Sequence, residues 1–116
     1  MKENIIQQKS YAFAVGVVKA CIFLQNENKE YVLSKQLLRS GTSIGANVEE
    51  AIGGQSRKDF YAKMTIAYKE ARETHYWIRL LFDTDYLPYN MKQELINQCD
   101  EILKIIGSIQ KTIRNS

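Results

Sequence analysis

The chain of 116 residues has the length of one domain, and we expect a single domain over residues 1–116. Its residues are 45% hydrophobic and 25% charged, which is typical of a folded protein and excludes a disordered tail. A net charge of +3 permits contact with nucleic acid without requiring it. The single proline, together with long periodic segments, favours an all-α protein.

The sequence also bears on the compartment of the protein. No segment reaches the roughly 20 consecutive apolar residues that a membrane-spanning helix needs, and residues 1–9 lack the apolar run of a signal peptide. Cys21 and Cys99 occupy apolar helical positions without a metal-binding spacing, as expected for buried free thiols. We therefore expect a cytoplasmic protein with no membrane partner.

Hydrophobic periodicity predicts a first helix over about residues 3–25 and a second over about residues 30–52. The second contains Gly41 and Gly45, each of which costs about 1 kcal/mol relative to alanine in a helix interior. Tertiary packing must offset that cost, and small residues four apart let a neighbouring backbone approach closely. The alternative interpretation is that both glycines are merely tolerated.

The second half of the chain predicts two further helices. Ser56 and Asp59 have the spacing of a capping box that opens a third helix over about residues 57–82. A fourth helix is predicted over about residues 89–114, with Pro88 in its first turn or Asn90 as its cap. Four long helices with short loops predict an antiparallel up-down-up-down four-helix bundle.

One face of the second helix is polar but carries few charges, whereas an ordinary solvated face would be richer in lysine and glutamate. Such a face is typical of a helix that meets another helix. Its members are Gln36, Arg39, Ser40, Ser43, Asn47 and Glu50.

The third helix has a basic edge that also carries a tyrosine. Lysine and arginine bind phosphates, and tyrosine can stack on unpaired bases. The alternative for a monomer is a solvated face, whereas a ring would repeat each cation once per subunit and concentrate the positive field. The candidate nucleic-acid-binding residues are Lys58, Lys69, Arg72, Tyr76 and Arg79.

Patterns for catalysis or metal binding are weak. His75 is the only histidine and lies on the apolar side of its helix, where we expect a structural role. Glu70 and Glu73 could perform acid–base work or hold a metal, but the Glu-x-x-His repeat of di-metal bundles is missing. Salt bridges to Arg39 or to a lysine are the expected role of these carboxylates. We expect no catalytic residue, metal site or cofactor.

Two segments resemble the four helix bundle protein family: Ser34–Ala51 (SKQLLRSGTSIGANVEEA) and Ala67–Ile78 (AYKEARETHYWI). Members of that family are encoded in intervening sequences of bacterial large-subunit ribosomal RNA genes. The family is similar to the accessory protein of diversity-generating retroelements. The resemblance covers nearly the whole chain, and it implies a bundle of four antiparallel helices that assembles into a homopentameric barrel. It also implies that the basic barrel of the retroelement relative binds nucleic acid and the reverse transcriptase.

The resemblance also assigns individual positions. The polar positions of the family in the second helix match Gln36, Arg39, Ser43, Asn47 and Glu50, and its acidic position in the third helix matches Glu73. We expect these side chains to form a network within or between subunits, with Arg39 paired to Glu50 or Glu73. An unpaired buried charge would cost several kcal/mol.

The leading interpretation is a non-enzymatic homo-oligomer, a pentamer by resemblance, that acts as a nucleic-acid-associated accessory protein. RNA is favoured over DNA by resemblance only. The alternative is a protein-interaction scaffold in which the polar face and the edge at Trp77 bind subunits or a protein partner. A third and weaker interpretation is an enzyme that uses Glu70 and Glu73.

Overall fold

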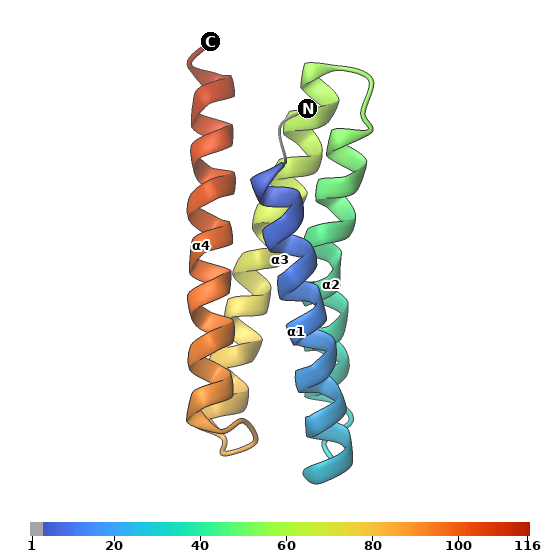
Figure 1. The fold of residues 1–116 in the computed structure, drawn as a ribbon, viewed down its shortest axis with the longest axis vertical. Helices are drawn as coiled ribbons and strands as arrows, with labels where there is room; N and C mark the ends of the chain where they lie inside the picture. Colours follow the sequence, from blue (N-terminus) through green and yellow to red (C-terminus); the bar gives the residue numbers. More distant parts are fainter. Residues whose placement is uncertain (1–3) are drawn as a thin grey trace.

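The computed structural model describes residues 4–116, which form four α-helices and contain no strand. The helices are α1 (Ile5–Glu27), α2 (Leu33–Ile52), α3 (Arg57–Asp83) and α4 (Tyr89–Arg114). Consecutive helices run antiparallel, so the beginning of α1 and the end of α4 lie at the same end of the molecule (Figure 1). The predicted all-α fold of four helices is confirmed. The expected start of the first helix at residue 3 falls outside the described residues.

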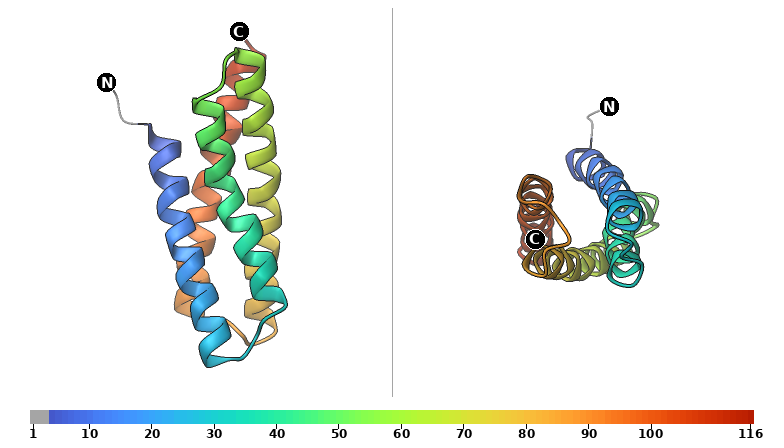
Figure 2. Two further views of the ribbon diagram at one scale, coloured as in Figure 1. Left: turned by 90° about the vertical axis from the view of Figure 1, so that its right-hand side faces the viewer. Right: turned by 90° about the horizontal axis from the view of Figure 1, so that it is seen from below.

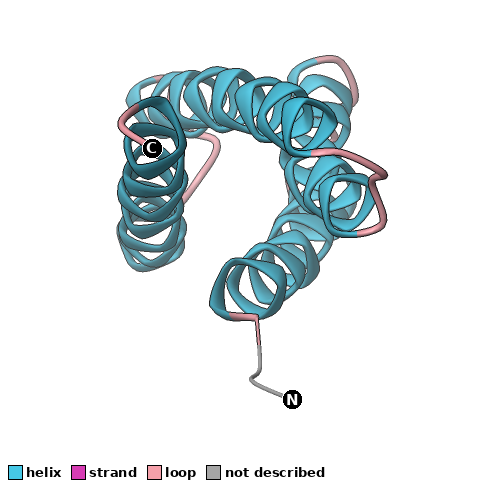
Figure 3. Cartoon of the chain, turned by 90° about the horizontal axis from the view of Figure 1, so that it is seen from above, coloured by secondary structure: helices cyan, strands magenta, loops and turns pink. Residues whose placement is uncertain are grey.

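The helices are arranged in the order of the chain. Within residues 4–116, α1 packs on α2, α2 on α3, α3 on α4, and α4 returns to α1. Seen end-on, the helices trace a ring that is least closed between α1 and α4 (Figures 2 and 3). In the described part of the chain, every helix is too short or too polar to cross a membrane.

The second helix begins later than the periodicity predicts, at Leu33 and not at residue 30. Glu30 lies before the helix, and its carboxylate accepts hydrogen bonds from the backbone N–H groups of Leu33 at 3.0 Å and Ser34 at 2.7 Å. Lys29 has a φ of 53°, which interrupts helical geometry between the two helices. Glu30 therefore satisfies N–H groups that the first turn of α2 would otherwise leave unpaired.

The Ser56 half of the predicted capping box is confirmed, because the Ser56 hydroxyl accepts a hydrogen bond from the Asp59 backbone N–H at 3.0 Å. The fourth helix begins at the predicted residue, Tyr89, but the roles expected for Pro88 and Asn90 at its start were wrong. Pro88 is extended, with φ −71° and ψ 156°, and stands just before the helix. The helix begins at Tyr89, so Asn90 lies inside the first turn and does not cap it.

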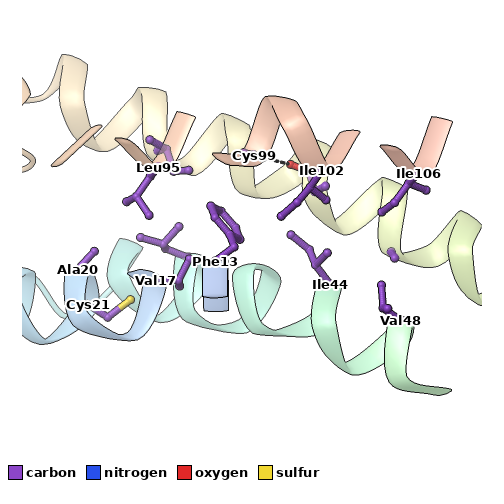
Figure 4. Close-up of a cluster of buried hydrophobic side chains, with 14 of the residues drawn as sticks. Phe13, Val17, Ala20, Cys21, Ile44, Val48, Leu95, Cys99, Ile102 and Ile106 are labelled. Carbon is purple, nitrogen blue, oxygen red and sulfur yellow. Dashed lines mark hydrogen bonds between the residues drawn. The ribbon is translucent and has the colours of Figure 1, made fainter. Parts of the chain in front are cut away.

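The core is built from the apolar seams of all four helices. Phe13 and Val17 of α1 are fully buried in one cluster with Ile44 of α2 and Ile102 of α4 (Figure 4). Burial of each such side chain stabilises the fold by roughly 1.5–3 kcal/mol. Each helix is rotated so that its apolar seam faces this core. The side chains on the opposite side of the helix are therefore exposed to solvent.

The two glycines of α2 lie against α1. A β-carbon on Gly41 would come within 2.8 Å of both γ-carbons of Val17, and one on Gly45 would lie 3.4 Å from the Ser10 carbonyl oxygen. The expected close approach of a second helix is therefore confirmed, and the interpretation that the glycines are merely tolerated was wrong for Gly41.

Candidate nucleic-acid interface

The basic edge of α3 faces away from the core. At 100° per residue, the five candidate residues fall within an arc of roughly 80° on the side opposite the buried Thr74. All five side chains are exposed. We name this surface the α3 outer face, and its members are Lys58, Lys69, Arg72, Tyr76 and Arg79.

The charge of the α3 outer face is uncompensated. Salt bridges within residues 4–116 involve none of its four cations. The rise of 1.5 Å per residue places Lys58 and Arg79 roughly 32 Å apart along the helix. In the same arc, Asp83 at the end of α3 is the one acidic side chain. The face is therefore a long row of four cations, none of which forms a salt bridge with a carboxylate in the described chain.

Three members of the face lie around one hollow of about 610 Å³. Its lining residues are Arg72, Glu73, His75, Tyr76, Arg79 and Leu103. The hollow has a volume in the range of small-molecule and nucleotide sites. Arg79 places its guanidinium carbon 6.0 Å from the centre of the Tyr76 ring, which keeps a cation beside an exposed aromatic ring.

The position of Arg79 is fixed by a chain of hydrogen bonds to α4. Its Nε donates to Nδ1 of His75 at 3.0 Å, and Nε2 of His75 lies 3.0 Å from a carboxylate oxygen of Asp100. Because Nδ1 accepts, the imidazole carries its proton on Nε2 and donates it to Asp100. His75 thus lies half-buried between α3 and α4, where it holds Arg79 in place.

Sequence reasoning missed part of this hollow. His75 was assigned a structural role, and Asp100 and Leu103 of α4 were not considered for the interface. Tyr61, Tyr68 and His75 stand seven residues apart and so share one side of α3, but this spacing does not indicate that α4 packs there. Lys58 and Lys69 do not line the hollow.

A second group of predicted residues meets between α2 and α3. Arg39 contacts both Glu73 and Glu70, the latter with Nη1 to Oε1 at 3.2 Å. Trp77 donates its indole N–H to the same Glu73 carboxylate at 2.9 Å. Of the two partners expected for Arg39, the structure brings Glu73 into contact, whereas Glu50 pairs with Lys63 at 2.8 Å.

The surroundings of this cluster differ from the expected buried network. The Arg39 side chain is 50% exposed, so water screens its charge and the large cost of an unpaired buried charge does not apply. Ser43 and Asn47 donate to carbonyl oxygens of their own helix, at 2.6 Å and 2.8 Å, and not to α3. In the described chain Gln36 is exposed and makes no side-chain hydrogen bond.

The carboxylates Glu70 and Glu73 are both engaged by Arg39, which is the role that the sequence predicted for them. Over residues 4–116, histidine, cysteine and acidic side chains do not gather in groups of three or more that could hold a metal.

The fold and this surface define a small four-helix protein with a cationic outer face. The chain belongs to the 23S rRNA-intervening sequence protein family, whose model matches residues 2–108. The family resemblance of the sequence is thereby confirmed.

A solved structure supports the same assignment. The chain is similar to a protein of unknown function from the S23 ribosomal protein family of Bacteroides thetaiotaomicron VPI-5482, with a TM-score of 0.90 and 50% sequence identity. The match covers 92% of this chain and 99% of that one. A comparison with curated proteins found no similar sequence.

Proposed function

We propose that the protein is a non-enzymatic accessory protein that binds nucleic acid through the α3 outer face. The observation that carries the proposal is the row of four cations without a carboxylate partner, set beside the exposed ring of Tyr76. Phosphates would neutralise these cations, and Tyr76 would stack on an unpaired base. The name of the family supports RNA as the polymer.

The proposal includes self-association. Four exposed apolar side chains recur on α1 at steps of four, three and four residues: Tyr11, Val15, Val18 and Ile22. This stripe lies apart from the buried seam of the same helix and has the spacing of a helix that packs against another helix. We propose that a second copy covers it. The resemblance supports a homopentamer, in which the α3 outer face would recur once per subunit.

The same stripe supports the alternative of a protein-interaction scaffold. In that case another protein would cover the stripe, and the α3 outer face would be an ordinary solvated surface. The two functions differ in one measurable property, which is salt-dependent binding of a polynucleotide.

The experiment is fluorescence anisotropy with labelled single-stranded RNA and duplex DNA across a salt series. We expect binding that weakens steeply as salt rises, because each phosphate contact releases a counterion. The variant Lys69→Ala/Arg72→Ala/Arg79→Ala should lose most of the binding and lower the salt slope.

The matched control removes the same charge elsewhere, on α1, on α2 and in the connection between them. It is Lys19→Ala/Lys29→Asn/Lys35→Ala, with asparagine at residue 29 because it tolerates the positive φ there. The control should bind like the wild type. If neither polymer binds at low salt, or if both triple variants lose binding equally, the proposal fails and the scaffold interpretation replaces it.

A further inference from the structure

A second cationic hollow lies at the end of the bundle where α3 begins and α4 ends, near the C-terminus in Figure 1. Its volume is about 560 Å³, and its lining residues are Arg57, Lys58, Tyr61, Ile113, Arg114 and Ser116. We name it the end hollow. Lys58 lies fourteen residues before Arg72, roughly 21 Å along α3, so the end hollow is separate from the hollow beside Tyr76.

The end hollow concentrates cationic side chains, and none of the side chains that line it is acidic. Three of its six lining residues are cations, and none of them joins a salt bridge in the chain from residue 4 onward. Arg114 donates from Nη1 to the Tyr61 hydroxyl at 3.0 Å, and Arg57 donates to the Ser116 hydroxyl. These neutral acceptors hold the guanidinium groups in place but leave their charge unneutralised.

The nearest acidic side chain of α3 turns away from the end hollow. Asp59 places its carboxylate against Gly54, where a β-carbon would overlap with it, and it does not line the hollow. Its backbone N–H is bound by the Ser56 hydroxyl at 3.0 Å. An incoming anion would therefore meet three cations without direct competition from Asp59.

Part of the wall of the end hollow is apolar. The Tyr61 ring and the Ile113 side chain lie beside the cations and offer surface for a flat organic group. A simple inorganic anion would use only the charge, whereas a phosphate attached to a nucleoside would use the charge and the apolar wall together. The volume of the hollow is in the range of sites that hold ligands of this size.

We propose that the end hollow binds a terminal phosphate monoester on a nucleoside, either in a free nucleoside monophosphate or at the end of a polynucleotide strand. At pH 7 a phosphate monoester carries a charge of about −1.5 to −2, so three cations favour it over an internal phosphodiester. Binding of a strand end rests on the proposed function, because Lys58 belongs to both the end hollow and the α3 outer face. Binding of a free nucleotide does not.

The first test is titration calorimetry of the full chain with adenosine monophosphate, adenosine and inorganic phosphate. The proposal expects the monophosphate to bind at least tenfold more tightly than either of the others. Arg57→Gln/Arg114→Gln should lose this binding, and Lys19→Gln/Lys35→Gln, which removes the same charge away from the end hollow, should keep it. Circular dichroism establishes that both variants are folded.

The second test compares a ten-nucleotide RNA with a hydroxyl, a 5′-phosphate or a 3′-phosphate at its ends. A preference for one phosphorylated form that disappears in Arg57→Gln/Arg114→Gln supports the strand end as the source. Tight monophosphate binding without that preference supports the free nucleotide.

The proposal is overturned if neither preference exists, or if inorganic phosphate binds as tightly as the monophosphate. It is also overturned if Arg57→Gln/Arg114→Gln binds the monophosphate and the RNA like the wild type. The triple variant of Lys69, Arg72 and Arg79 retains all the cations of the end hollow. Its RNA binding therefore tests the proposed function separately.

Discussion

Cys99 of α4 donates its thiol to the carbonyl oxygen of Ala71 on α3, with a sulphur–oxygen distance of 3.3 Å across the helix interface (Figure 4). Burial, with a smaller contribution from the charge of Asp100, raises the pKa of this thiol from its ordinary value of 9.0 to about 12. Burial and the nearby Glu30 raise the pKa of Cys21 to about 11. Both thiols are therefore neutral at pH 7.

We predict that a thiol-specific reagent labels neither cysteine of the native protein at pH 7, and labels both after denaturation, because the thiolate is the reactive form. Stability follows from the same pKa values. Above pH 9 the unfolded chain releases protons that the folded chain retains, so the free energy of unfolding falls as the pH rises from 9 toward 12. Fast labelling of the native protein would contradict the assignment of buried thiols.

Alanine at the two glycines of α2 should change the free energy of unfolding in opposite directions, lowering it at Gly41 and raising it at Gly45. Gly41→Ala introduces a methyl group 2.8 Å from Val17, and overpacking of this kind costs about 1–3 kcal/mol, more than the roughly 1 kcal/mol of helix propensity gained. Gly45→Ala meets its nearest atom at 3.4 Å, so the propensity gain should dominate. Urea unfolding of both variants, and of Gly41→Ala combined with Val17→Ala to relieve the overlap, checks the prediction. Equal effects at the two positions would contradict it.

The pair of Arg39 and Glu73 should contribute little to stability despite its short contact. Arg39 is half-exposed, and exposed pairs contribute about 0.2–1 kcal/mol. A double-mutant cycle with Arg39→Ala and Glu73→Ala measures this coupling by urea unfolding. The fluorescence of Trp77 should also change in Glu73→Ala, because its indole N–H loses the carboxylate that accepts its hydrogen bond. Arg39→Ala leaves that hydrogen bond intact and should not change the fluorescence in the same way. A coupling of several kcal/mol would show that the pair is buried, for example in an assembly.

Glu30 should contribute more to the stability of the fold than is usual for a residue in a loop between two helices. Its carboxylate accepts three backbone hydrogen bonds at the start of α2, from Val32, Leu33 and Ser34. Hydrogen bonds to charged groups contribute about 1.5–3 kcal/mol, and a lost cap alone costs about 1 kcal/mol. Glu30→Ala should therefore lower the free energy of unfolding by about 2 kcal/mol. The control Glu27→Ala, which removes an exposed glutamate nearby, should have a much smaller effect.

The exposed stripe of α1 should control self-association. Val15→Glu/Val18→Glu places two charges on side chains that are 39% and 40% exposed, so the isolated fold should tolerate them while a subunit contact should not. Sedimentation should then show a smaller particle with unchanged helix content. Ile66→Glu, at a position 41% exposed on α3, is the control and should leave the mass unchanged. A monomeric wild type would contradict self-association through this stripe.

The sequence predicts the helices better than it predicts the surfaces between them. Hydrophobic periodicity indicates the helices because a core seam, which here includes the buried Phe13, Ile44 and Ala71, repeats at every turn of a helix. It extended the second helix back to Glu30, since it cannot tell a glutamate inside a helix from one that caps it. The contact between α3 and α4 at His75 depends on the rotation of both helices, which periodicity does not give.

The sequence gives less indication of the end hollow than of the α3 outer face. Arg57 and Arg114 are separated by most of the second half of the chain and meet only because an antiparallel pair returns α4 to the start of α3. The basic edge of α3 was visible in the sequence because its members belong to one helix. A site shared by the ends of two helices has no such local pattern.

The ring of helices has a consequence for how the protein folds during synthesis. Since each helix packs on the one before it, α1, α2 and α3 can dock as the ribosome releases them, and only the closure of α4 on α1 joins distant parts of the chain. Chains dominated by local contacts fold fast, within microseconds to milliseconds. The exposed stripe of α1 is therefore synthesised first and stays exposed while the rest of the chain is made. The nascent chain thus carries an apolar surface that can associate with other chains before α4 exists.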